Sequence, residues 1–119
     1  MTWLDTFTVT VFKNETLLAS GTVDGPVVKL NDYKPEFGLA SLQVFSAGAS
    51  SVVKLEYVCS NDGVTYNVPA GATDIVTAHA PGHAHYEFTL PVCKFMKIRA
   101  TETGGTDPVT DLDAMLALR

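Results

Sequence analysis

Hydrophobic and polar residues alternate with a period of two along most of this chain, which is typical of β-strands with one buried face. The stretch Ser51–Tyr66 shows it most clearly, because its apolar positions fall on one side of an extended chain: Val53, Leu55, Tyr57 and Cys59. Asn61-Asp62-Gly63 follows, and an Asp-Gly pair favours a tight hairpin because both residues tolerate a positive φ. The pattern therefore predicts a strand, a turn at Asp62 and a return strand that begins at Val64.

The same alternation predicts strands in the rest of the chain. The expected strands are Thr6–Lys13, Leu17–Val23, Val27–Leu30, Gly38–Phe45, Asp74–Ala78, Tyr86–Leu90 and Phe95–Thr101. Residues that favour turns separate them, at Asn14–Thr16, Asn31–Pro35, His79–His83 and Thr103–Pro108. Helices do not alternate with these strands in the pattern, so a parallel-sheet fold is not expected.

The last segment, Val109–Arg119, fits two structures. Its leucines and Ala114 keep a strict period of two, as in a strand, whereas Thr110 with Asp113 resembles a helix capping box. We expect a strand, because the rest of the chain is extended and a closing strand would complete a sheet. The chain then has eight to ten short strands with turn signals roughly every 8–12 residues, which predicts an all-β antiparallel β-sandwich or jelly roll formed by a single domain, residues 1–119.

Composition supports this fold and narrows the choice of partners. The chain has fourteen valines and fourteen threonines, which favour strands, and its 119 residues suffice for a core without disulfides. The net charge is −5, and the one basic cluster, Lys94–Arg99, is too short for the basic stripe that nucleic-acid binding needs. No apolar run approaches the ~20 residues that span a bilayer. We therefore expect no nucleic-acid and no membrane partner.

The first residues lack the basic and apolar regions of a secretory signal peptide. We therefore expect the protein in the bacterial cytoplasm or in a virion, where release follows cell lysis. Without an oxidising compartment, Cys59 and Cys93 are expected to be reduced thiols.

Three histidines form the pattern H-x3-H-x-H: His79, His83 and His85. In an extended chain His83 and His85 point the same way and Glu87 continues the row, so imidazoles and a carboxylate could hold a metal ion. In a single chain, a solvated loop with satisfied histidines is the favoured explanation of the same residues. A symmetric trimer would improve the site, because three H-x-H pairs supply six nitrogens around one axis. His83 and His85 are thus the candidate metal ligands, and no other cofactor is expected.

The residues specify no reaction. A serine nucleophile elbow is absent, and nothing in the sequence ties a histidine to either cysteine. Carboxylate pairs such as Asp111 and Asp113 lie beside turns or on an expected solvent face, and the Asp62 loop lacks the calcium-binding frame. We therefore expect a protein that is not an enzyme.

A carbohydrate-binding face would need exposed aromatic residues. The candidates for ligand-facing aromatics are Trp3, Tyr33 and Tyr66. Phe37, which follows Tyr33 in the same loop region, is a further plausible exposed aromatic. Alternation turns Tyr57 towards the core, where tyrosines are commoner than in sugar-stacking platforms.

Two segments resemble known proteins. Val53–Tyr66 (VKLEYVCSNDGVTY) and Pro91–Gly105 (PVCKFMKIRATETGG) resemble small β-sandwich accessory and structural proteins encoded in phage and prophage structural-gene clusters. The same hairpin followed by a K-F-x-K-I-R strand also looks like discoidin-type and carbohydrate-binding sandwiches, in which the aromatic after D-G is often tryptophan rather than the Tyr66 of this chain. The resemblance implies a virion or assembly component and supplies no catalytic residue.

Two functions follow from these observations. The first is a non-enzymatic structural or assembly component of a phage or prophage particle, which self-associates as a trimer or higher ring and contacts other virion proteins. A mean hydropathy of +0.17 with 18% charged residues fits buried subunit contacts, and the expected sheet edges, Leu17–Val23 and Val109–Arg119, carry few charges. The second is a carbohydrate- or receptor-binding module. An aromatic row on the surface would favour the second function, and a flat apolar patch at a symmetry axis would favour the first.

Overall fold

The computed structural model describes residues 6–33, 35 and 38–119, and within them the chain forms nine strands and one short helix. The strands are β1 (Phe7–Leu17), β2 (Thr22–Asp24), β3 (Val28–Lys29), β4 (Leu39–Ala47), β5 (Val53–Ser60), β6 (Val76–His79), β7 (Gly82–Thr89), β8 (Phe95–Glu102) and β9 (Val109–Leu118). The helix α1 (Leu30–Tyr33) has four residues and stands where the sequence predicted a loop. Among the described residues, no helix is long and apolar enough to cross a membrane.

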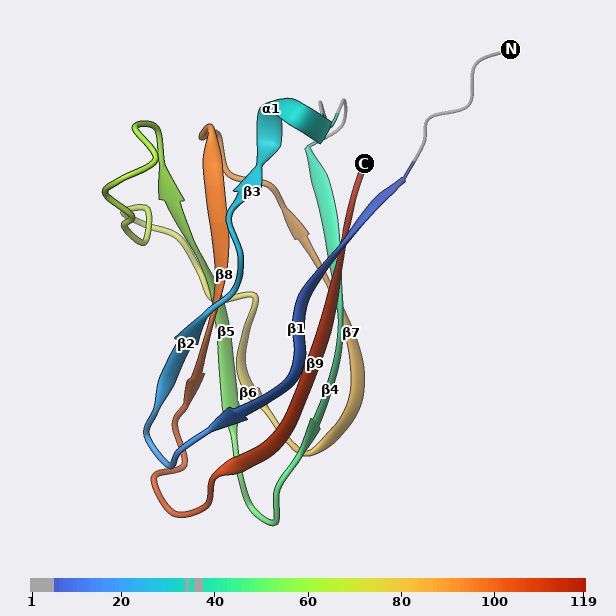
Figure 1. The fold of residues 1–119 in the computed structure, drawn as a ribbon, viewed down its shortest axis with the longest axis vertical. Coiled ribbons are helices and arrows are strands. Elements are labelled where there is room, and N and C mark those ends of the chain that lie inside the picture. The colour runs from blue at the N-terminus through green and yellow to red at the C-terminus, as the bar shows by residue number, and fades with distance from the viewer. Residues whose placement is uncertain (1–5, 34, 36–37) are drawn as a thin grey trace.

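The strands form two antiparallel sheets that pack face to face (Figure 1). Sheet A has the strand order β1-β9-β4-β7, and sheet B has the order β2-β8-β5-β6, with β3 also paired to β8. The chain crosses between the sheets repeatedly, as in β1 to β2, β4 to β5 and β8 to β9. The predicted all-β antiparallel sandwich of eight to ten strands is confirmed.

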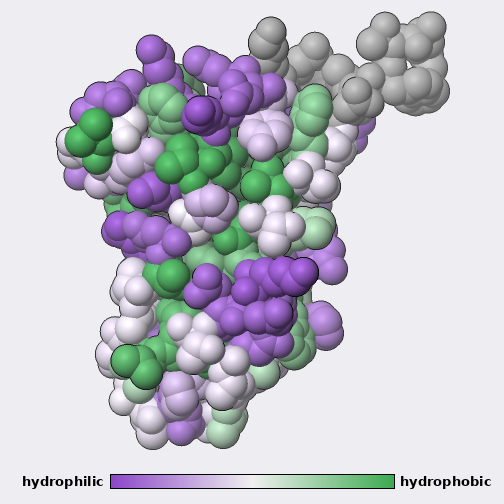
Figure 2. Space-filling model, in the orientation of Figure 1, coloured by the Kyte–Doolittle hydropathy of each residue, from purple (hydrophilic) through white to green (hydrophobic). Residues whose placement is uncertain are grey.

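The inner faces of the two sheets enclose one hydrophobic core. The core side chains with no exposed surface are Leu42, Val44, Val53, Leu55, Met96, Ile98, Ala100, Val109, Leu112, Leu116 and Leu118. Apart from Val109, they fall at alternate positions of β4, β5, β8 and β9, as the period of two predicts. Burying each large aliphatic side chain contributes roughly 1.5–3 kcal/mol. Figure 2 looks onto the side of the sandwich, where apolar surface shows between the sheets in the upper half of the view.

β1 runs straight through the turn that the sequence predicted at Asn14–Thr16. Its register with β9 shifts three times between Thr10 and Leu17, and Asn14 has a positive φ of 52°. The Asn14 N–H donates a hydrogen bond to the Asp113 carboxylate at 2.9 Å, so the turn-forming residues are accommodated as a bulge within the strand.

Another of these register shifts, between Thr10 and Phe12, changes which residues of β1 face the core. Val11 and Phe12 are adjacent in the sequence, yet both are buried, which a regular strand does not allow. The predicted strand Leu17–Val23 is wrong, because Leu17 ends β1 and the Gly21 N–H closes a turn on the Leu18 carbonyl at 2.8 Å. This turn carries the chain from sheet A to sheet B.

The predicted return strand after Asp62 is also wrong. The Asp62 carboxylate accepts hydrogen bonds from the Val64 and Thr65 N–H groups, at 2.8 and 2.9 Å, which curls the backbone into a local turn. These bonds, above all the one from Thr65, lower the pKa of Asp62 to about 2. The chain returns to β5 only at Asn67, which exchanges two backbone hydrogen bonds with Cys59. The Asp62-Gly63 pair therefore forms a turn, as predicted, but not a hairpin.

The C-terminal segment is a strand, as expected, but it does not lie at an edge. β9 pairs with β1 on one side and with β4 on the other. Its charge-poor sequence is therefore explained by its place inside sheet A, and the expectation that Val109–Arg119 forms a sheet edge is wrong. The edges of sheet A are β1 and β7.

A buried carboxylate holds three loops together at one end of the sandwich. Glu102, at the end of β8, is 1% exposed, and no cation accompanies it among the described residues. It accepts backbone hydrogen bonds from Val52 (2.8 Å), Ser20 (3.1 Å), Gly104 (2.9 Å) and Gly105 (2.7 Å). Donation by these groups, first of all Val52, lowers the pKa of Glu102 to about 2.

The substitution Glu102→Gln should destabilise the fold and lower its thermal midpoint by at least several degrees, because the amide NH2 group would face backbone donors. The ordinary pKa of 4.5 exceeds the folded value, so the carboxylate stabilises the fold above about pH 4.5 and loses this effect as the pH falls towards 2. Thermal melts across this window should therefore show a smaller acid-dependent loss in the variant. Equal acid dependence in both proteins would contradict the assignment, and Glu87→Gln, which changes an exposed glutamate, is the control.

Candidate functional site

The outer face of sheet A, which we call the A face, presents aligned rows of side chains. Cross-strand pairing places one row across all four strands: His85, Gln43, Met115 and Thr10. The next row consists of His83, Phe45 and Asp113. The imidazole of His83 packs on the ring of Phe45, with 4.6 Å between the ring centroids. The A face thus combines aromatic and apolar surface with hydroxyl, amide and charged groups.

Two shallow hollows lie end to end along β4 and β9 on the A face. The first, of about 580 Å³, is lined by Thr10, Lys13, Gln43, Phe45, His83 and Met115, among others. The second, of about 500 Å³, is lined by Thr6, Leu39, Ser41, Glu87, Ala117 and Arg119, among others. We call the two hollows together the groove. Along β4 from Leu39 to Phe45 the groove extends ~20 Å at ~3.3 Å per residue, so it suits an extended ligand better than a compact one.

The polar groups of the first hollow have few partners within the protein. In the described part of the chain, the side chains of Thr10, Lys13, Gln43 and His83 make no hydrogen bond to protein and no ion pair. Solvent satisfies them in the free protein, and a polar ligand could replace that solvent at little cost. The hydroxyl, amide, imidazole and ammonium groups supply both donors and acceptors.

The outer face of sheet B, which we call the B face, differs from the A face in how many of its polar side chains have partners within the protein. Most of its charged side chains have partners within the chain: Arg99 with Asp24 (2.7 Å), Lys54 with Glu56 (3.1 Å), and Lys97 with the ring of Tyr66 (4.1 Å to the centroid). Lys29, which is exposed on β3, has no such partner among the described residues. The Arg99 guanidinium lowers the pKa of Asp24 through its hydrogen bonds. The contrast between the two faces identifies the A face as the candidate site.

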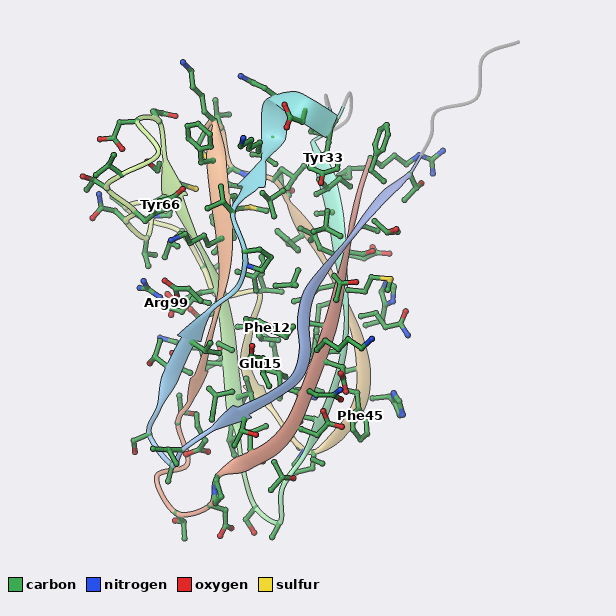
Figure 3. All side chains as sticks on the ribbon, viewed as in Figure 1. Phe12, Glu15, Tyr33, Phe45, Tyr66 and Arg99 are labelled. Carbon is green, nitrogen blue, oxygen red and sulfur yellow. The ribbon has the colours of Figure 1, made fainter. Side chains whose placement is uncertain are left out.

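The described aromatic residues that the sequence suggested as ligand-facing do not lie together on one surface. Trp3 lies outside the described residues, as does Phe37. Tyr33 is half-buried against the core and meets Phe7 edge to face at 5.8 Å. Tyr66 lies over the B face, whereas Phe45 lies on the far side of the molecule at sheet A (Figure 3). Within the described residues, no row of aromatic side chains joins Tyr33 and Tyr66.

Sequence reasoning missed Phe45 and Gln43, although the signal was present. Once Ala40, Leu42 and Val44 are assigned to the buried face, the residues between them must point outwards. An aromatic residue on the outward, more polar face of a central strand is the feature to look for, and Phe45 is such a residue, half-buried on β4. Which strands lie beside β4, and hence that Met115 and Thr10 join the row, depends on pairing that the pattern does not encode.

The histidines separate into two groups. His83 and His85 are exposed and share the outer face of β7 with Glu87, as the alternation predicts. His79 lies in β6 of the other sheet and is buried, and Ala80–Pro81 forms the actual turn within the predicted turn His79–His83. No group of three His, Cys, Asp or Glu side chains in the described residues is placed to hold a metal ion. A metal site at His83 and His85 remains a prediction that needs ligands from a second chain.

His79 has a structural role at the crossing from β6 to β7. Its Nε2 lies 3.2 Å from the Gly82 carbonyl, which can only accept, so Nε2–H donates and Nδ1 accepts from the Tyr86 hydroxyl at 2.7 Å. Burial lowers the pKa of His79, which favours this neutral form. It is therefore not available as a ligand.

Asp111 and Asp113 lie two residues apart on β9, beside the first hollow. One carboxylate oxygen of Asp111 is buried without a hydrogen-bond partner. Burial, with the nearby Asp113 carboxylate, raises the pKa of Asp111. The pair contributes negative charge to this end of the A face.

No protein-family model matches the chain, and no curated protein matches it in sequence. Its fold is similar to that of the CBM36-1 domain of a multidomain xylanase from the hindgut metagenome of Trinervitermes trinervoides, with a TM-score of 0.53 and 11% sequence identity over 95% of this chain and 96% of that domain. It is also similar to the SPBc2 prophage-derived protein YomS, with a TM-score of 0.47 and 12% identity over 98% of this chain and 96% of the other. The first likeness shows a shared β-sandwich fold and nothing about the ligand.

Both cysteines are unpaired and half-buried. Burial, and then contact with Cys93, raises the pKa of Cys59 to about 12, so its thiolate is scarce near neutral pH. Alkylation of the unreduced, denatured protein should add two labels, and Cys59 should react slowly in the native protein. Mass spectrometry after digestion measures both. Absence of labels, or rapid native labelling of Cys59, would contradict the structure.

Proposed function

We propose that this chain is a non-enzymatic carbohydrate- or receptor-binding module of a phage or prophage particle, and that the A face binds an extended polar chain such as a bacterial surface polysaccharide. The observation that carries the proposal is the contrast between the two outer faces. The A face has two hollows end to end with unpartnered polar groups, whereas most charges of the B face are paired.

The composition of the A face favours a carbohydrate over a charged polymer. Sugars present apolar C–H faces and hydroxyl groups, which match the ring of Phe45, the thioether of Met115 and the amide of Gln43. Cationic and anionic side chains are mixed along the groove, since Lys13 and Asp113 line the first hollow and Glu87 and Arg119 line the second. A strongly charged ligand would meet charges of its own sign.

The setting in a phage particle rests on the sequence resemblance of Val53–Tyr66 and Pro91–Gly105. Both segments belong to sheet B and its loops, so they concern the scaffold of the sandwich and not the A face.

Binding should be measured by screening the untagged protein against arrays of bacterial surface glycans and titrating the best ligand by calorimetry. The double variant Gln43→Ala, Phe45→Ala should weaken binding by roughly tenfold or more, because central contacts of an interface carry most of its free energy. Its thermal midpoint should stay close to that of the parent protein, since both side chains point out of the core.

The matched control is Tyr66→Ala, which removes an aromatic residue from the opposite face. It should bind like the parent protein. Loss of binding in Tyr66→Ala with normal binding by the double variant would place the ligand on the B face and overturn the proposal.

A further inference from the structure

The free edges of the two sheets are not equally protected. On sheet B, β2 and β3 have three and two residues and β6 has four, and short edge strands pair poorly with other chains. On sheet A, β1 is interrupted by bulges and carries Lys13 and Glu15. β7 has eight residues, forms an unbroken ladder with β4, and contains Glu87 as its one carboxylate and no lysine, arginine or proline. It is the longest regular edge in the described residues.

The backbone N–H and C=O groups that are open at this edge belong to the residues of β7 whose side chains lie on the A face. The Leu90 N–H donates to the Gly38 carbonyl at 2.7 Å, and Leu90 lies in register with the ladder of β4 and β7. Backbone groups of an antiparallel strand alternate in direction, so the even-numbered residues of β7 bond to β4. The N–H and C=O groups of His83, His85 and Glu87 therefore point to the open edge.

A second copy of β7 could pair here only in registers that keep outward-facing residues opposite one another. A two-fold axis perpendicular to the sheet satisfies this condition. With the axis at Ala84, His83 of each copy lies opposite His85 of the other, and the cross-strand pairs have Cβ atoms about 5.5 Å apart. The His83 imidazole, which packs on Phe45 in the single chain, would turn towards the axis, and four imidazoles would then surround it on the outer surface. Four nitrogen ligands suit a tetrahedral zinc ion.

From these features we infer that His83 and His85 of two copies of this chain together hold a divalent metal ion such as Zn²⁺, and that the ion joins the copies edge to edge through β7. The site is incomplete in one chain, which agrees with the absence of a three-ligand group within the described residues. A two-fold pair replaces the trimer that the sequence suggested, because a strand edge accepts one partner strand.

The pairing has a consequence for binding. A two-fold axis perpendicular to the sheet leaves both A faces on the same side of one continuous eight-stranded sheet. Two grooves would then face the same surface, which raises the avidity for a repetitive polymer without any new contact. The inference does not depend on what the A face binds.

The test uses untagged protein at micromolar concentration, by size-exclusion chromatography with light scattering, after EDTA treatment and after addition of ZnCl2. The mass should rise from 12.7 kDa to twice that value with zinc and return with EDTA. Calorimetry should give one zinc per two chains. His83→Ala and His85→Ala should each abolish the change in mass, while circular dichroism confirms that both variants fold.

Glu87→Gln is the matched control, because it changes the next residue of the same row and lies outside the four-imidazole cluster. It should dimerise with zinc like the parent protein. A mass that stays at 12.7 kDa with zinc, zinc binding at one per chain, or a zinc-dependent dimer that survives the loss of both histidines would overturn the inference.

Discussion

The sandwich depends on one buried carboxylate. Glu102 accepts hydrogen bonds from the loops β1–β2, β4–β5 and β8–β9, and each of these loops carries the chain between the two sheets. Three of the four strands of sheet A, namely β1, β4 and β9, are therefore tied to sheet B at one anionic centre. A buried charge without a counter-ion is stable only when such donors surround it, so its loss would release all three crossings together.

This constraint connects the scaffold to the candidate site. The groove of the A face runs along β4 and β9 and is flanked by β1, so its floor consists of the strands that Glu102 holds. Residues that point inwards from these strands form the core, and the residues between them form the groove. The same alternation therefore builds both surfaces, and a rigid floor presents Phe45 and Gln43 without the cost of ordering a loop.

The period of two predicts the fold class and most strands, because burial of alternate residues is a local property of the sequence. The prediction of strands and turns from this period fails where a side chain accepts hydrogen bonds from backbone N–H groups. Asn14 and Asp113 turn a predicted loop into a bulge, and the Asp62 carboxylate takes the N–H groups that a return strand would have used. The position of β9 between β1 and β4 could not be predicted either, since a charge-poor strand suits both an interior position and an edge that pairs with another chain.

The site was predicted less well than the fold, for the same reason. That His83 and His85 share an exposed face follows from spacing alone. That Phe45 meets His83, and that Met115 and Thr10 extend the row of Gln43, requires the pairing of four strands distant in sequence. Tyr33 packs against Phe7 and Tyr66 lies over the B face, and their separation could not be predicted because local aromatic content says nothing about which sheet a loop covers.

The central claim, that the A face is the functional surface, is tested most directly by mapping a bound glycan with amide chemical shifts of the labelled protein. The account predicts that the perturbed amides cluster on β4 and β9 around Gln43, Phe45 and Met115, with little change on β5 and β8. Perturbations centred on Tyr66, Lys97 and Arg99 would contradict it.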